Sequence, residues 1–141
     1  MPLLKPIAGH TGCAGIKSYL EKNGRALGIQ VMNFAWQEER VFEDVAAAPI
    51  GFDWAASMDA TRHACGNDTP YRGKPARTFK HFVMSPDPQD GLSTDQVAEL
   101  AQTWTKRHFA DFEVAIVLHD DNEGRIPHAH IVVNNTNLAT E

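Results

Sequence analysis

The sequence has no apolar run approaching the roughly 18 residues that a membrane-spanning helix needs. Its N-terminus also lacks the charged region followed by an apolar core that marks a secretory signal. Cysteine is scarce, since Cys13 and Cys65 are the only two, and free thiols are their simplest interpretation. Repeats, low-complexity tracts and linkers are missing as well. We therefore expect one cytoplasmic domain, because 141 residues suffice for a single two-layer core.

Basic residues are outnumbered, with 13 Lys and Arg against 18 Asp and Glu and a formal net charge of −5. Nucleic-acid-binding domains usually carry a basic excess, so the overall charge argues against that class. Local basic patches nevertheless exist. Lys17, Lys22 and Arg25 are close together near the N-terminus, and residues 71–80 contain four cations and two aromatic rings without an acid.

The order of apolar patterns predicts an α+β fold with an antiparallel sheet. Strands are expected at residues 3–8, 29–36, 78–84, 112–119 and 128–134, and helices at 14–22, 53–65 and from Ser93 onward. Pro6 confines the first strand to a sheet edge or a bulge. Asp53 is a plausible N-cap, and Ser93 with Gln96 forms a capping box. Residues 37–49 do not favour any one structure.

The most informative stretch runs from Val114 to Asn134. Strand alternation puts His128 and His130 on one face. If the two strands pair as neighbours through residues 120–124, His119 can lie on the same face. Three neutral imidazoles bind a divalent ion and leave coordination positions open for substrate oxygens. An isolated His-x-His is more often incidental, but the third histidine favours a metal site.

Residues 119–134 carry His-x-Asp, a short turn, Pro-His-x-His, an aliphatic triplet and Asn. This run resembles the third motif of the relaxases, the mobilisation nucleases within the HUH endonuclease superfamily. The resemblance covers about residues 5–137. It implies a ferredoxin-like or RRM-like antiparallel sheet with helices on one face and the histidines on the open face.

The resemblance also implies an activity: site-specific nicking and rejoining of one DNA strand at an origin of transfer, through a covalent 5′-phosphotyrosine. The cofactor would be Mg²⁺ or Mn²⁺ held by the three histidines. Of the two tyrosines, Tyr19 lies in a stretch similar to the first relaxase motif and is the expected nucleophile. Tyr71 is expected to stack on a base or to cover a loop.

Three further residues match family motifs. Ser85 ends a strand that is similar to the second motif, Asp121 is placed to accept the second N–H of an imidazole, and Asn134 closes the third motif with a role that is either catalytic or structural. The expected DNA contacts are Lys17, Arg25, Tyr71, Arg72, Lys74 and Arg77. The remaining histidines, His10, His63, His81 and His108, are interpreted as structural.

Relaxases usually continue beyond the third motif, so the resemblance implies that residues 1–141 are the nuclease part of a longer protein. Its partners would be single-stranded DNA at the origin, accessory mobilisation proteins and a coupling protein. The protein itself is not expected to insert into a membrane. Two alternatives remain. A replication-initiator type of HUH nuclease generally has its tyrosine after the His-x-His, whereas here no tyrosine follows Tyr71. A catalytically idle module that binds single-stranded DNA requires neither the three histidines nor Tyr19.

Overall fold

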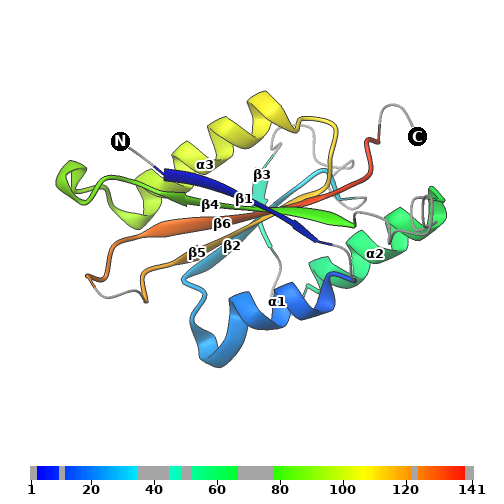
Figure 1. Ribbon diagram of the computed structural model, residues 1–141, viewed down its shortest axis with the longest axis horizontal. Helices are drawn as coiled ribbons and strands as arrows, with labels where there is room; N and C mark the ends of the chain where they lie inside the picture. The colour runs from blue at the N-terminus through cyan, green and yellow to red at the C-terminus, as the bar shows by residue number, and fades with distance from the viewer. Residues whose placement is uncertain are drawn as a thin grey trace.

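The structure is a computed structural model that describes residues 3–9, 12–34, 45–48, 52–66, 78–121 and 124–138. Strands and helices alternate through most of the chain (Figure 1). In chain order they are β1 (Leu3–Gly9), α1 (Ala14–Glu21), β2 (Gly28–Met32), β3 (Val45–Ala47), α2 (Trp54–Ala64), β4 (Phe79–Ser85), α3 (Thr94–His108), β5 (Val114–His119) and β6 (His128–Asn134). Short 3-10 turns lie at Lys22–Gly24 and Pro88–Asp90.

The strands form one six-stranded antiparallel sheet in the order β1-β4-β6-β5-β2-β3. β5 and β6 occupy the centre, and all of their residues are buried. Pro6 lies in β1, which is an edge strand, so the prediction for this proline is confirmed. The predicted α+β class with an antiparallel sheet is also confirmed. The central position of β5 and β6 gives each histidine-bearing strand a hydrogen-bonded neighbour on both sides.

The helices cover both faces of the sheet, which corrects the expectation that they lie on one face. α3 lies on one side, and α1 and α2 lie on the other (Figure 1). Val97 and Ala101 of α3 pack against a core that includes Ile116 of β5. Leu20 of α1 and Trp54 of α2 belong to a second core on the opposite face. Both faces of the central strands are apolar, so each needs a cover, and the histidine face is not left open.

That second core contains three small or β-branched residues from the central strands: Ala115, Val117 and Val132. They share their face with the histidines, because residues two apart on a strand point the same way. Burying them against α1 and α2 brings the end of α1 toward the histidine end of β5. The same packing that stabilises the core therefore positions the site.

Local signals set several element boundaries as predicted. Asp53 accepts a hydrogen bond from the Ala56 amide and caps α2, and Ser93 with Gln96 forms the reciprocal capping box of α3. The predicted strand at 29–36 is too long within the described residues: β2 spans Gly28–Met32 and ends there, because Asn33 adopts a left-handed φ of 68°. Residues 35–36 of that prediction lie outside the described residues. β3 lies in the segment whose sequence favoured no single structure. None of the helices described is both long and apolar enough to cross a membrane.

Candidate metal centre

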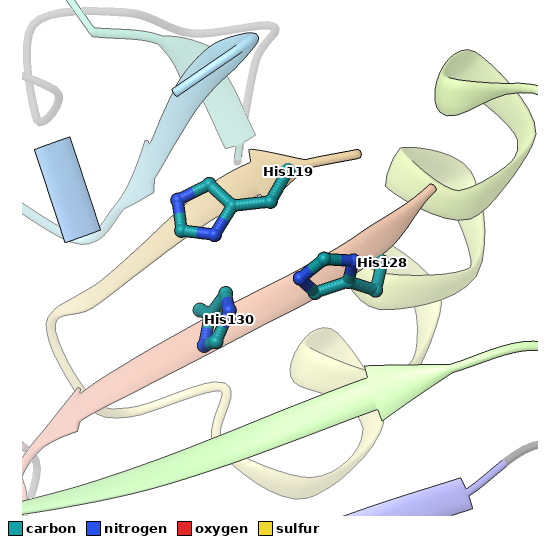
Figure 2. A group of neighbouring side chains, drawn as sticks. All are labelled: His119, His128 and His130. Carbon is teal, nitrogen blue, oxygen red and sulfur yellow. The ribbon is translucent and has the colours of Figure 1, made fainter. Parts of the chain in front are cut away.

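Three histidine side chains meet on the face of the sheet that α1 and α2 cover. In the pairing of β5 with β6, His119 lies opposite His128, and Val117 lies opposite His130. The ring centroids are 5.5 Å apart for His119 and His128, 4.5 Å for His119 and His130, and 5.1 Å for His128 and His130. One nitrogen of each ring lies within 4.8 Å of the other two (Figure 2). The expected convergence is confirmed.

Hydrogen bonds fix the orientation of two of these rings through backbone carbonyls. His119 Nε2 donates to the Leu20 carbonyl over 2.6 Å, and His128 Nδ1 donates to the Ile126 carbonyl over 3.1 Å. A carbonyl can only accept, so the proton position on each ring is determined. The other nitrogen of each ring, His119 Nδ1 and His128 Nε2, is left with a lone pair.

Two ring nitrogens in the cluster stand out as buried without a hydrogen bond. These are His119 Nδ1 and His130 Nε2, which have no partner among the described residues. A buried nitrogen without a partner costs about 1–3 kcal/mol, so native structures rarely retain one without a reason. A divalent ion bound by the three lone pairs supplies that reason. The donor set therefore fits a metal, and three protein ligands leave room for substrate, as in catalytic sites.

Burial favours the neutral form of two rings in the cluster, those of His119 and His130. Burial, followed by the neighbouring His119, His81 and His128 rings, lowers the pKa of His130 to about 3. Burial also lowers the pKa of His119. A protonated imidazole has no lone pair to offer a metal, whereas the lowered pKa values keep the His119 and His130 rings neutral near pH 7. These two rings thus keep a lone pair for an ion at physiological pH.

A fourth histidine, which sequence reasoning interpreted as structural, adjoins the cluster. His81 on β4 is buried, and its Nε2 lies 2.8 Å from His130 Nδ1, with the two ring centroids 5.0 Å apart. Strand pairing explains the contact, because His81 lies opposite Val132 and thus diagonally beside His130. In the sequence, only the alternation of His81 with Phe82 indicated that His81 could lie on the histidine face. The sequence did not show that β4 pairs with β6, so the contact with His130 was not predicted.

Tyr19 lies on α1 one residue before Leu20, whose carbonyl contacts His119, and its side chain is 57% exposed. Arg25 connects it to the end of β5. The guanidinium stacks over the Tyr19 ring at 5.0 Å, donates to the Tyr19 carbonyl, and forms an ion pair with Asp121 at 2.8 Å. The hydrogen bond from Arg25 lowers the pKa of Asp121. The Asp121 carboxylate thus binds Arg25 and not an imidazole. Backbone carbonyls hydrogen-bond the outward-facing nitrogens of His119 and His128, and His81 hydrogen-bonds that of His130.

The other predicted site residues have mixed placements. Lys17 forms an ion pair with Glu21, so part of the Lys17 charge is compensated. The other carboxylate oxygen of Glu21 accepts a hydrogen bond from the Trp54 indole. Ser85 ends β4, on the same face as His81 by alternation. Four of the expected DNA contacts lie outside the described residues: Tyr71, Arg72, Lys74 and Arg77.

Asn134 belongs to a buried polar network at the far end of β6. Its amide nitrogen donates to the Met58 carbonyl and to the Glu113 carboxylate, and its oxygen accepts from Arg62. Arg62 also bonds Asp59, and Asp59 in turn accepts from the amide of Cys13 before α1. This chain of bonds ties both helices to β6. Of the two roles left open by the sequence, these contacts support the structural one.

The fold is α+β, and three imidazoles converge on the central strands of its antiparallel sheet. These two features define a protein with a candidate catalytic metal site. A model of the family "Relaxase: MobA/VirD2-like, nuclease domain" matches residues 36–141. The match spans well over half of the chain, so the protein belongs to this relaxase family. It includes the three histidines and His81 but begins after Tyr19. No curated protein matches the chain closely enough to count as a relative.

Proposed function

We propose that this relaxase domain nicks and rejoins one strand of DNA at the origin of transfer of a plasmid or integrative element. The observation that carries the proposal is the convergence of His119, His128 and His130 in a chain of the relaxase family. Two of the convergent nitrogens, on His119 and His130, are buried without a hydrogen-bond partner among the described residues. A purely structural histidine cluster has no need of unpaired lone pairs at its centre.

The three imidazoles hold a divalent ion, Mn²⁺ or Mg²⁺, in this proposal. When bound, the ion supplies positive charge that polarises the scissile phosphate. The carbonyls of Leu20 and Ile126 hold the rings of His119 and His128 so that their lone pairs face inward. Mg²⁺ prefers oxygen ligands, so Mn²⁺ is the better probe of an all-nitrogen donor set.

Tyr19 is the proposed nucleophile. Its phenol oxygen forms a bond to the scissile phosphorus, and the bond from phosphorus to the 3′ oxygen breaks. The phenol loses its proton to solvent, and the leaving oxygen gains one to become a 3′ hydroxyl. The reverse reaction rejoins the strand. Support comes from the exposure of Tyr19, from its place beside Leu20, and from the Arg25 guanidinium that stacks on its ring.

Arg25 has a second role in this proposal, because a guanidinium suits a phosphate oxygen. It reaches Tyr19 and Asp121 at once, so it joins α1 to the strand end that carries His119. The proposed partners are single-stranded DNA, accessory mobilisation proteins and a coupling protein in the cytoplasm. Contacts from residues 71–77 with that DNA remain a prediction.

The test is cleavage of single-stranded oligonucleotides tiled across the origin of the element that encodes the protein. We expect a protein–DNA adduct that survives denaturant, requires Mn²⁺ or Mg²⁺ and disappears in Tyr19→Phe. Tyr71→Phe is the matched control, since it removes the other phenol of the chain. An adduct lost in Tyr71→Phe but kept in Tyr19→Phe would contradict the assignment of the nucleophile.

A second candidate, an idle module that only binds single-stranded DNA, is favoured by one observation. The family match includes the three histidines but begins after Tyr19, so the match by itself does not support the proposed nucleophile. Calorimetry separates the two functions. The idle module predicts no divalent-metal affinity and unchanged DNA binding in His128→Ala.

A further inference from the structure

The hydrogen bond between His81 and His130 differs from the other bonds that orient the cluster. His119 and His128 donate to backbone carbonyls, which are fixed acceptors. His130 instead faces another imidazole, with 2.8 Å between His130 Nδ1 and His81 Nε2. An imidazole nitrogen either donates or accepts, so this bond allows two arrangements of the protons.

Only one of the two arrangements suits an ion. If His81 donates from Nε2, then His130 carries its proton on Nε2, and that nitrogen points into the cluster as a buried N–H without an acceptor in the described part of the chain. If His130 donates from Nδ1, its Nε2 keeps a lone pair beside the free nitrogens of His119 and His128. In that case His81 carries its own proton on Nδ1. The inward lone pair thus depends on His81 acting as the acceptor.

His81 is not well placed as a further ligand. Its Nε2 is the atom that meets His130, and the group of convergent ligand atoms in the described part of the chain consists of three residues without it. Its ring is inclined by 31° to that of His130, against 56° between His119 and His130. His81 therefore lies where it can orient His130, a ligand of the ion, and not where it would contact the ion itself.

We propose that His81 is a positioning residue, which accepts the Nδ1–H of His130 and so holds the His130 ring with its Nε2 lone pair directed at the ion. The proposal rests on the proposed metal site. Partners that orient metal-binding histidines in this way typically contribute 10–100-fold to metal affinity. Among the three orienting acceptors, His81 is the one that a side-chain substitution can remove.

The experiment compares the wild type with three variants of the full chain. His81→Phe keeps a planar ring but has no acceptor, and His81→Gln restores an acceptor near the position of the imidazole Nε2. His108→Phe is the matched control, because His108 lies exposed on α3, on the opposite face of the sheet. Mn²⁺ affinity is measured by calorimetry, and folding by thermal melting without metal.

We expect His81→Phe to weaken Mn²⁺ binding by about 10–100-fold, His81→Gln to recover most of that loss, and His108→Phe to bind like the wild type. Long-range ¹H–¹⁵N spectra of the metal-free wild type supply a second readout. They should show the His130 proton on Nδ1, and in His81→Phe a mixture of both tautomers. If His81 had a merely structural role, the variants would change the melting temperature without this pattern of Mn²⁺ affinities and His130 tautomers.

Three results overturn the proposal. They are wild-type affinity in folded His81→Phe, no recovery in folded His81→Gln, and a His130 proton on Nε2 in the metal-free wild type. The last needs no variant, so it decides the matter even if His81→Phe does not fold. A wild-type protein without Mn²⁺ affinity overturns the metal site itself, and the tautomer of His130 then still tests the role of His81 separately.

Discussion

Acidifying the metal-free protein should reveal the buried state of His130 through its effect on stability. Burial and the nearby imidazoles lower the pKa of His130 from 6.5 to about 3. A lowered pKa in the folded state means that the neutral ring stabilises the fold above pH 6.5. This contribution is lost as the pH falls toward 3, because the unfolded chain gains a proton first. The matched perturbation is His130→Gln, which replaces the ring by an amide that does not titrate.

The magnitude follows from the two pKa values. Between pH 6.5 and about pH 4.5 the unfolded imidazole becomes protonated while the folded one stays neutral, so His130 alone lowers the free energy of unfolding by about 2 kcal/mol. Burial lowers the pKa of His81 and His119 in the same direction. Glu113, whose pKa is raised by burial, acts in the opposite direction, but it is present in both proteins and cancels in the comparison.

The assay is urea unfolding at both pH values, with a chelator present so that ion release does not contribute. We expect the wild type to lose about 2 kcal/mol more than His130→Gln across this interval. Equal losses in the two proteins would show that His130 titrates normally in the folded state. The reasoning from burial would then be refuted, whatever the absolute stability of either protein.

Three other perturbations test separate parts of the structure. Asn134→Ala should lower the free energy of unfolding by about 3 kcal/mol, since Met58 and Glu113 lose a buried donor; urea unfolding measures this, and a loss below about 0.5 kcal/mol contradicts the structural role. Ser93→Ala should cost about 1 kcal/mol in the same assay through loss of the α3 cap, and no change would argue against the capping box. Mn²⁺ at 100 times its Kd should raise the free energy of unfolding by about 2.7 kcal/mol, and a melting shift that persists in His119→Ala would place the ion elsewhere.

Much of the site follows from local sequence. Strand alternation fixes that His128 and His130 share a face, and pairing of the two strands through the intervening hairpin allows His119 to lie on that face as well. The capped start of α3 and the edge position of β1 follow from single residues, Ser93 and Pro6. These features depend on groups that are close in the chain, so residue type and spacing suffice to predict them.

The placement of the helices on both faces did not follow from the sequence, because it depends on how chain segments far apart are connected. A strand buried on both faces reads as a continuous apolar run, as Val114 to Leu118 does. Such a run shows that both faces are covered without showing which helix covers which face. The resemblance to the family suggested one covered face, and the packing of Leu20 and Trp54 on the other corrected it.

The amino-acid sequence by itself determined the fold class, the shared face of the three histidines and the resemblance to relaxases, since each rests on periodicity or on a motif of contiguous residues. Only the tertiary structure decided which nitrogen of the His119 and His130 rings is free. That choice depends on partners remote in the chain: Leu20 lies 99 residues from His119, and His81 lies 49 residues from His130. A hydrogen bond requires atoms to meet within about 3 Å, and only the folded register of β4 on β6 and the packing of α1 on the sheet bring these groups that close.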